Sequence, residues 1–241
     1  MFWPHLERVA RVCRDPPAGL CCGVLTPRQA RLAVFASGNG TNFEALAQAH
    51  DRLGGRIVTV LCDRADAPVL ERARRHGIEA LTPPAGRFRS KLEDESAWLA
   101  LLRERCIDVV VLAGFMRRLH ATLLTPFAGR MLNIHPSLLP AFPGLDGIGQ
   151  AFRHGVSVTG CTVHLVEDAL DSGPIVAQAA VEVLASDTLE TLERRLHEAE
   201  HALYPAAIRR FLTEPWHLDG RRLVFGSGTG LSLNETEAAR G

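Results

Sequence analysis

The sequence predicts an α/β fold with a mostly parallel, twisted sheet, helices on both faces, and an antiparallel strand addition in the C-terminal half. Between residues 31 and 135, short apolar runs alternate with stretches of helical periodicity, which is the pattern of consecutive βαβ units. The run 108–115 is apolar on both faces, as a central parallel strand requires. Beyond Pro143, two strand-like runs follow one another without a helix between them, which favours an antiparallel pair.

The elements of the parallel part are bounded by residues with known local preferences. Gly77 follows a helical stretch and can adopt the left-handed conformation that ends helices. Pro136 cannot donate to a central ladder, so the preceding strand should end at His135. In chain order we expect strands over 31–37, 56–63, 78–84 and 108–115 and one ending at His135, separated by helices over 43–50, 67–77 and 89–106 and by one short helix.

The C-terminal half has a different pattern. Residues 158–168 and 174–183 read as strands joined by the tight acidic turn "DALDSG". We expect them to pair antiparallel at the edge of the sheet. Residues 188–212 read as one long helix that Pro205 disturbs, because proline removes one backbone hydrogen bond and crowds the preceding turn.

The two ends of the chain lie outside this regular pattern. Asp219-Gly220 centres a small hairpin over 216–225, and the segment from residue 226 is rich in Gly, Ser and Glu, which predicts disorder. The first thirty residues are either a disordered extension or the product of an upstream start codon. We therefore divide the chain into an N-terminal extension (1–30), one main domain (31–213), and a C-terminal hairpin with a flexible tail (214–241).

The composition excludes several classes of protein. Hydrophobic residues make up 46% and charged residues 22% of 241 residues, and the formal net charge is zero. A nucleic-acid-binding protein would show a basic stripe, so we expect a small-molecule partner and no nucleic acid. The N-terminus lacks the apolar core of a signal peptide, and no stretch approaches the ~18 apolar residues of a membrane helix. We expect a cytoplasmic protein that does not bind membranes and is a monomer or a homodimer.

The six cysteines do not form a recognisable framework. They show no CxxC spacing, so we expect neither disulfides nor a zinc knuckle. Cys62, Cys106 and Cys161 lie in or beside apolar runs, where a thiol acts as a small hydrophobic side chain.

Asn133 and His135 form the first candidate site. Side chains two positions apart on a strand share a face, so both point to the same side where the strand ends. Ligands of open α/β sheets bind at that carboxyl edge. An amide donor beside a titrating imidazole suits a carbonyl oxygen that becomes an oxyanion, although a lone histidine in such a place is more often structural.

Two further segments are candidates for binding and proton transfer. "SGNGTN" (37–42) lies between a strand and a helix and can cradle an anion on backbone N–H groups. Phe43 replaces the third glycine of the dinucleotide motif, so a monophosphate fits better, and a merely capped turn is about equally plausible. In "EDALDSG" (167–173), Asp171 could orient His135 and favour its protonated form, although a solvated acidic loop is a strong alternative.

The stretch "HEAEH" (197–201) matches the zinc-peptidase signature literally. The match has only three fixed positions, and no third ligand constellation follows it. Polar residues on an exposed helix face are the more plausible explanation. A third interpretation is that Glu200 or His201 reaches a substrate hydroxyl.

Together these pieces resemble the folate-dependent formyltransferases, and among them the phosphoribosylglycinamide formyltransferases. The matching segments run in family order from residue 31 to 212: "SGNGTNFEAL", "DVVVLAGFMRRL", "MLNIHPSLLPAFPGL", "GCTVHLVEDALDSGPIVAQ" and "EHALYP". The short start without a preceding regulatory domain favours this enzyme over formyltetrahydrofolate deformylase. The missing C-terminal barrel disfavours methionyl-tRNA formyltransferase.

The resemblance implies a Rossmann-like sheet and transfer of the formyl group of 10-formyltetrahydrofolate, the co-substrate, to the amine of glycinamide ribonucleotide, in purine biosynthesis and without a metal. It implies the catalytic residues Asn133, His135 and Asp171. It implies that the ribonucleotide is bound by Gly40, Thr41, Asn42, His197 and Glu200. It implies that the folate is bound by Lys91, Met116, Arg117, Arg118, Leu119, Asn133, Glu167, Asp168 and Asp171.

The sequence departs from the family pattern at two places. Lys91 stands where the family tends to carry an arginine, which leaves its contact with folate open. Gly147, Ile148 and Gly149 replace bulkier polar residues, so we expect a looser flap there. The alternatives to the purine enzyme are a related folate formyl-group enzyme such as the deformylase, a zinc hydrolase using "HEAEH", and a non-catalytic phosphometabolite-binding module.

Overall fold

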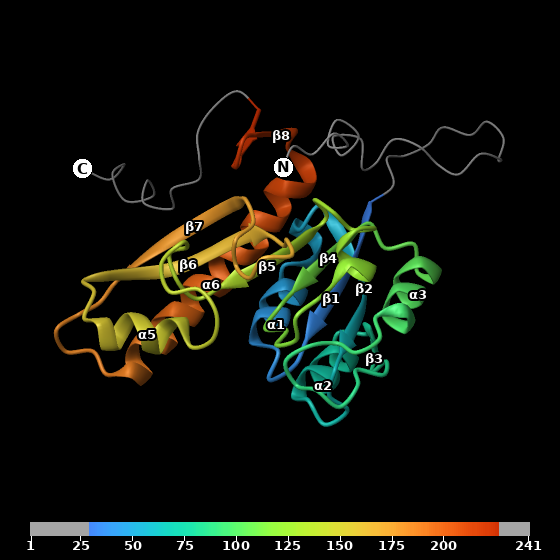
Figure 1. Cartoon of the computed structure of the whole chain (residues 1–241), viewed down its shortest axis with the longest axis horizontal. Helices are drawn as coiled ribbons and strands as arrows, with labels where there is room; N and C mark the ends of the chain where they lie inside the picture. The colour runs from blue at the N-terminus through green and yellow to red at the C-terminus, as the bar shows by residue number, and fades with distance from the viewer. Residues whose placement is uncertain (1–28, 227–241) are drawn as a thin grey trace.

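The computed structural model describes residues 29–226 and shows the predicted α/β sheet with its antiparallel addition (Figure 1). Seven strands lie in the order β3-β2-β1-β4-β5-β6-β7. The first five are parallel, and β6 and β7 run antiparallel to their neighbours. The strands are β1 (Ala30–Ala36), β2 (Gly55–Cys62), β3 (Glu79–Leu81), β4 (Val109–Leu112), β5 (Met131–His135), β6 (Val158–Leu165) and β7 (Ile175–Glu182).

The connecting helices are α1 (Thr41–Gln48), η2 (His50–Arg52), α2 (Pro68–Arg75), α3 (Ser96–Glu104), α4 (Ala121–Leu124), α5 (Gly147–His154) and α6 (Leu189–Thr213). The hairpin predicted around Asp219-Gly220 is confirmed as β8 (Trp216–Asp219) and β9 (Arg222–Phe225). The tail expected to be disordered begins at residue 226, and from residue 227 it lies outside the described residues, as do residues 1–28 of the expected extension.

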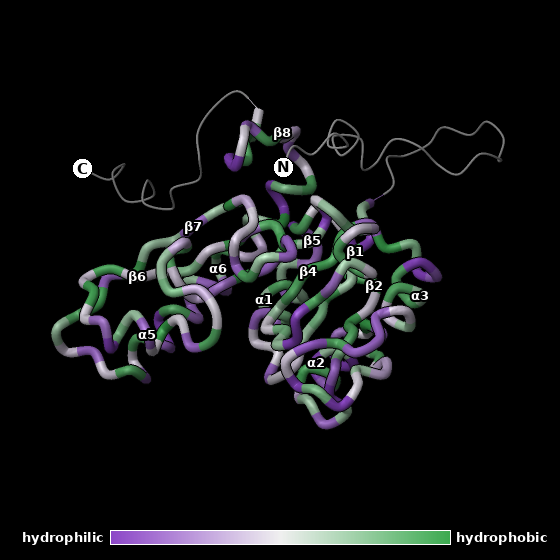
Figure 2. Tube along the Cα trace, viewed as in Figure 1, coloured by the Kyte–Doolittle hydropathy of each residue, from purple (hydrophilic) through white to green (hydrophobic). Residues whose placement is uncertain are grey.

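The hydrophobic core is split by the sheet into two layers. Leu32, Val34 and Ala36 of β1 belong to the cluster beneath α1, α2 and α6, whereas Ala33 and Phe35 belong to the cluster beneath α3 and α4. The central strand β4 alternates in the same way and is buried at all its positions. In Figure 2 the hydrophobic colour accordingly follows the central strands. Burial on both faces explains why these strands read as continuous apolar runs.

The helix expected over 89–106 is shorter than predicted, because α3 begins only at Ser96. The preceding residues are held instead by long-range contacts: the Leu92 backbone N–H donates to the carbonyl oxygen of Arg118 at 3.3 Å. The buried carboxylate of Glu95 accepts backbone N–H groups of His120 at 2.6 Å and Leu123 at 2.9 Å. Glu95 therefore caps α4, and helical periodicity alone could not show this competing use.

The predicted single long helix is confirmed, and α6 continues unbroken through Pro205. Packing explains this, because Leu203, Tyr204 and Ala207 around the proline are buried against the sheet. The Tyr204 hydroxyl lies 2.8 Å from the carbonyl oxygen of Leu112, at the end of β4, and 3.2 Å from that of Leu132 in β5. Burial raises the pKa of this phenol, so it remains a donor. Tertiary contacts thus hold one long helix across the sheet.

Burial decides the expectation for the three cysteines in the described part of the chain. Cys62 and Cys161 are fully buried as predicted, but Cys106 is exposed in a left-handed turn after α3, so its expected hydrophobic role is wrong. In the part of the chain that the structure describes, no helix combines the length and hydropathy needed to cross a membrane.

Candidate active site

The end of β5 brings Asn133 and His135 to one face of the sheet, as the strand spacing predicts. His135 is buried, whereas Asn133 is half-buried. The antiparallel pairing of β5 with β6 places His164 directly opposite Asn133. Asn133 Nδ2 lies 3.2 Å from His164 Nε2, within hydrogen-bond distance.

Asp171 reaches this pair from the loop that follows β6. Its Oδ2 lies 3.4 Å from His135 Nδ1, and its Oδ1 lies 3.7 Å from His164 Nε2. The carboxylate is 8% exposed and also accepts the Gly144 backbone N–H at 2.7 Å. Asp171 has a left-handed backbone with φ of 47°, a conformation that costs a non-glycine residue of the order of 1 kcal/mol. The surrounding contacts therefore hold a strained turn that aims the carboxylate at two imidazoles.

Both ring nitrogens of His135 face oxygen acceptors. Nδ1 faces Asp171, and Nε2 lies 2.8 Å from the carbonyl oxygen of Phe142. The imidazole is therefore held from both sides, by the Asp171 loop and by the backbone at Phe142.

His164 is a member of the cluster to which the sequence analysis assigned no role. It is 2% exposed, and its Nδ1 lies 2.8 Å from the carbonyl oxygen of Leu165, which makes Nδ1 the donor and leaves Nε2 as an acceptor for the Asn133 amide. Burial lowers the pKa of His164 and so favours this neutral form. The sequence places His164 within the predicted strand 158–168, but only the register with β5 shows which side chain it meets.

The "SGNGTN" turn joins β1 to α1. Gly40 caps the helix in the left-handed conformation with φ of 77°, and no side chain caps the N-terminal amides of α1. A Cβ at Gly40 would lie 2.5 Å from a methyl carbon of Val69 on α2, so the tight packing there requires glycine. The first helical amides, from Thr41 on, lack intrahelical acceptors and can bind an anion.

Asn42, Glu200 and His197 form a hydrogen-bonded chain between α1 and α6. Asn42 Nδ2 donates to Glu200 Oε2 at 3.1 Å, and the same oxygen lies 3.0 Å from His197 Nδ1. Glu200 is 3% exposed, and its hydrogen bond raises the pKa of His197. The Asn42 Oδ1 atom is buried without a hydrogen-bond partner among the described residues, so it can accept a donor from a ligand.

Residues of "HEAEH" take part in these contacts between α1 and α6. His197 bonds to Glu200, and its ring stacks on that of His201 with centroids 6.4 Å apart. Within residues 29–226, no group of three or more His, Cys, Asp or Glu side chains is placed to hold a metal ion.

The segment 116–119 follows β4 at the same edge of the sheet. Met116 is 59% exposed and its backbone N–H donates to Ser37 Oγ at 2.9 Å, whereas Leu119 is buried. Arg117 is buried with its guanidinium against Asp63, and Arg118 donates to the carbonyl oxygen of Asp168 at 3.0 Å. The structure therefore links 116–119 to the acidic loop 167–171 but does not turn Arg117 toward it.

Three other predicted residues lie around this segment. Lys91 forms an isolated parallel bridge with Arg118, and its side chain is exposed near the Phe88 ring. Asp168 is exposed and lies 3.5 Å from Arg118 through its carboxylate, and Glu167 is half-buried. These residues therefore lie around the segment 116–119, and among the described residues none of them forms a hydrogen bond or an ion pair with His135.

The flap expected at residues 147–149 is instead the first turn of α5. Gly147, Ile148 and Gly149 are buried, and Asp146 caps the helix by accepting the Gly149 N–H at 3.1 Å. A Cβ at Gly147 would lie 3.1 Å from His135 Nε2. The small residues therefore allow close packing beside the imidazole, and the expectation of a looser flap is wrong.

A cavity with a volume of about 680 Å³ lies between α1 and α6. Thr41 contributes to one side, and His201 and Arg209 to the other. It therefore adjoins the start of α1, whereas none of the catalytic candidates lines it.

Comparisons with known proteins match this architecture. A family model described as "Formyl transferase" matches residues 30–208. The chain is 45% identical over 184 residues to a phosphoribosylglycinamide formyltransferase of Bacillus subtilis (strain 168), covering 76% of this chain and 94% of the relative. A relative of the same name from Escherichia coli (strain K12) is 41% identical over 192 residues, covering 79% and 88%. The crystal structure of glycinamide ribonucleotide transformylase 1 from Symbiobacterium toebii aligns with a TM-score of 0.79 at 45% identity, covering 85% of this chain and 97% of that one.

Proposed function

The chain belongs to the formyl transferase family, and from this premise we propose how its residues transfer a formyl group to the amine of glycinamide ribonucleotide. The co-substrate is a formyltetrahydrofolate, and we assign it as 10-formyltetrahydrofolate. The reaction forms a C–N bond to the amine and breaks the bond between the formyl carbon and N10 of the folate. The observation that carries the assignment is the buried contact of Asp171 with His135 beside Asn133 at the carboxyl edge of the sheet.

The ribonucleotide half of the site comprises Gly40, Thr41 and Asn42 on one side and His197 and Glu200 on the other. The uncapped amides at the start of α1 bind the phosphate, with the helix dipole adding partial positive charge. His197, whose pKa is raised, supplies charge near the anion. Glu200 and the free Oδ1 of Asn42 accept hydrogen bonds from the ribose and glycinamide groups.

The folate half of the site comprises Lys91, Met116, Arg117, Arg118 and Leu119, together with Asn133 and the loop residues Glu167, Asp168 and Asp171. Exposed apolar side chains border this region, with Met116 59%, Leu145 79% and Leu170 64% exposed. Apolar surface beside polar backbone groups suits a flat heterocycle. Main-chain groups of 116–119 and of the 167–171 loop form hydrogen bonds with the polar edge of the pterin.

Catalysis uses the amide and the imidazole at the end of β5. The substrate amine attacks the formyl carbon and produces a tetrahedral oxyanion. Asn133 has a second amide hydrogen besides the one directed at His164, and it donates this hydrogen to the oxyanion. Protonated His135 stabilises the same charge, and Asp171 keeps His135 oriented and protonated.

Proton transfer completes the reaction. Asp171, with water, takes a proton from the newly bonded amine, and the folate N10 receives a proton as its bond to the formyl carbon breaks. In the present structure, the carbonyl oxygen of Phe142 occupies the acceptor position at His135 Nε2. We infer that the 139–147 loop shifts when substrate oxygen takes this position. Holding both substrates in line supplies a further part of the acceleration.

One assay tests this assignment against its alternatives. Purified protein is given 10-formyltetrahydrofolate with and without glycinamide ribonucleotide, and both formylated ribonucleotide and formate are measured. We expect product only with the ribonucleotide, and the same rate with a metal chelator. Formate release without the ribonucleotide would instead indicate a deformylase, chelator-sensitive activity would support a zinc site at "HEAEH", and ribonucleotide binding without turnover would indicate a binding module.

A further inference from the structure

Arg117 lies within the segment that borders the folate half, yet its side chain is directed into the protein. Its Nε donates to Asp63 Oδ2 at 2.6 Å, and the two side chains are only 7% and 5% exposed. Asp63 directly follows β2, whereas Arg117 follows β4. The ion pair therefore joins two strand ends that are separated in the sheet by β1.

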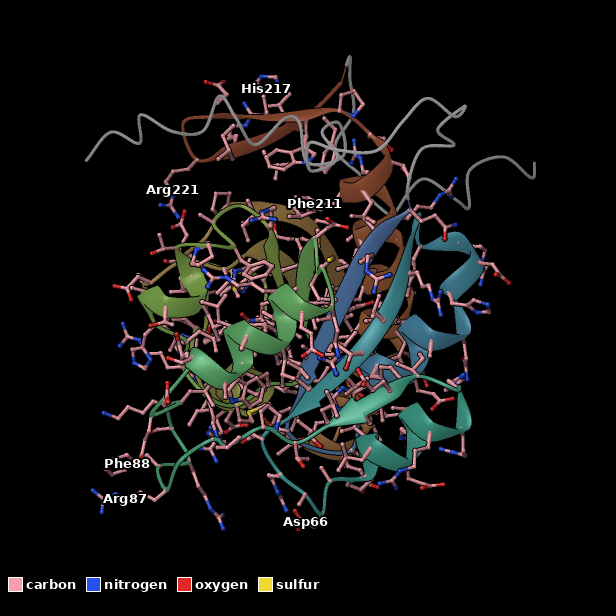
Figure 3. All side chains as sticks on the ribbon, turned by 90° about the vertical axis from the view of Figure 1, so that its right-hand side faces the viewer. Asp66, Arg87, Phe88, Phe211, His217 and Arg221 are labelled. Carbon is pink, nitrogen blue, oxygen red and sulfur yellow. The ribbon has the colours of Figure 1, made fainter. Side chains whose placement is uncertain are left out.

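The same guanidinium also holds the loop 85–91, which we call the strap. Arg117 Nη1 donates to the carbonyl oxygens of Ala85 at 3.1 Å and Lys91 at 3.2 Å, and to that of Phe88 between them. The strap contains no helix, and its outer side chains project from the protein: Arg87 and Phe88 lie at the periphery in Figure 3. One buried side chain thus gathers three carbonyl groups of an otherwise irregular loop.

The strap lies directly against the segment 116–119. The Arg118 backbone N–H donates to the carbonyl oxygen of Ser90 at 2.9 Å, and Lys91 and Arg118 form a parallel bridge. On its other side, Arg118 reaches the 167–171 loop through the carbonyl oxygen of Asp168. Strap, segment 116–119 and acidic loop therefore form a continuous wall along one side of the site.

The chemistry of the pair favours a positioning role over a simple contribution to stability. Transferring two charges from water into the protein interior costs free energy, and a buried ion pair often stabilises no more than an apolar pair of similar size. Asp63 Oδ1 is also buried without a hydrogen-bond partner among the described residues, which adds to that cost. What the pair supplies is geometry, because the planar guanidinium presents several donors in fixed directions.

We propose that the Asp63–Arg117 pair is a positioning device for the folate half: it fixes the strap against 116–119 and so sets the affinity for the pterin co-substrate. This inference rests on the proposed function. Within residues 29–226, neither Arg117 nor Asp63 hydrogen-bonds to Asn42, Glu200 or His197, so we expect the pair to have little effect on ribonucleotide binding. Arg117 thus acts on the co-substrate through the backbone it holds.

The test compares Arg117→Lys and Asp63→Asn with a control pair elsewhere. Lysine keeps the positive charge, but its single nitrogen cannot take the place of both Nε, which donates to Asp63, and Nη1, which donates to the strap carbonyls. The control is Arg105→Lys, because Arg105 also pairs bidentately with a carboxylate, that of Glu79, away from the site. We measure kcat, KM for both substrates, binding of 10-formyltetrahydrofolate alone, and backbone amide hydrogen exchange.

For Arg117→Lys we expect KM and Kd for the folate to rise by about tenfold, with KM for the ribonucleotide within about twofold of the wild type. Amide exchange should increase in peptides covering 85–91 but not in those covering β1 or α6. Asp63→Asn should show the same pattern more weakly, since asparagine still accepts the Arg117 hydrogen bond. Arg105→Lys should change neither folate KM nor exchange in the strap.

Several outcomes would overturn the inference. Unchanged folate affinity and strap exchange in both variants would remove the positioning role even though the wild type transfers formyl groups. An equal rise in both KM values would show a general structural effect. If Arg117→Lys fails to fold, Asp63→Asn decides by the same criteria. If the wild type transfers no formyl group, the proposed function fails, and the strap is then judged by exchange alone.

Discussion

The two halves of the site are built in different ways. The ribonucleotide half consists of the start of α1 and one face of α6, and its internal contact between His197 and Glu200 spans a single helical turn. The other half, with the catalytic cluster, consists mainly of loops, and Phe142, Asp146 and Asp171 there have left-handed backbones. Both halves also have contacts between residues far apart in sequence, but Asn42 and Glu200 lie on helices, whereas Arg117 and Asp63 lie outside helices and strands.

This difference indicates that the two halves of the site have different functions. Helix ends give a preformed cradle for a phosphate, a group whose recognition needs only N–H donors and positive potential. Transfer of a carbon between two substrates needs side chains aimed within tenths of an ångström, and here several loops supply that aim by holding strained turns. We therefore expect substitutions in the first half to change ribonucleotide binding, and those in the second to change turnover or folate affinity.

The largest expected effect is that of Asp171→Asn. Without the carboxylate, His135 loses the negatively charged acceptor at Nδ1 and the site loses its proton acceptor, so kcat should fall by roughly 10³-fold. Ribonucleotide affinity, measured by calorimetry, should not change. The matched control is Asp66→Asn, whose carboxylate is 75% exposed in a surface ion pair (Figure 3). Near-normal kcat in Asp171→Asn would show that the cluster does not carry the reaction.

Asn133→Ala should rank second. Removing one oxyanion donor typically costs about 10²-fold in kcat, and KM for both substrates should change little because the bond tightens in the transition state. Steady-state kinetics with both substrates separate these parameters. A rise in KM at constant kcat would place Asn133 in ground-state binding instead.

Glu200→Gln tests the opposite half. Loss of the charged acceptor weakens the hydrogen bonds to Asn42 and His197 and to the ligand, so KM for the ribonucleotide should rise by about tenfold. The folate KM should stay unchanged. If kcat falls and ribonucleotide KM does not rise, Glu200 belongs to the chemistry and the division between the halves fails.

Gly147→Ala should have a moderate effect on turnover. The added Cβ would approach His135 Nε2 to 3.1 Å, with the carbonyl oxygens of Phe142 and Pro136 each 3.3 Å away, so the imidazole must shift by tenths of an ångström. We expect kcat to fall by about fivefold while the thermal unfolding midpoint stays close to that of the wild type. Gly226→Ala, at the end of the β8–β9 hairpin, is the comparison, since its Cβ would meet nothing within 4 Å. Equal kcat in the two variants would contradict close packing at His135.

The smallest effect concerns pH. The hydrogen bond to Glu200 raises the pKa of His197, so the ring keeps its charge to higher pH than an ordinary histidine. Ribonucleotide KM should rise as pH increases through that raised pKa, by about threefold because the side chain is half-exposed. The stabilising contribution of the pair is present below the ordinary histidine pKa and is lost over the same rise. His197→Gln should flatten the pH profile of KM, and an unaltered profile would exclude His197 as its source.

Much of the fold could be predicted from local patterns. The parallel strands read as apolar runs because both faces are buried. The turn "SGNGTN" was identified because its glycines lie between a strand and a helix, and Gly40 has a left-handed conformation there. The start of α3 was missed because Glu95 and the preceding residues contact α4 and Arg118 instead of continuing a helix. The helix α6 continues through Pro205 because packing against the sheet compensates for the one hydrogen bond that proline cannot donate.

Local sequence patterns were sufficient to predict the order of strands and helices, the face shared by Asn133 and His135, and the loop that carries Asp171, because these follow from periodicity and from residues that end elements. Three contacts could be found only in the folded protein: His164 faces Asn133, Arg117 turns inward to Asp63, and Gly147 packs on His135. Register and loop conformation depend on contacts between distant residues, whose free energy no local pattern records.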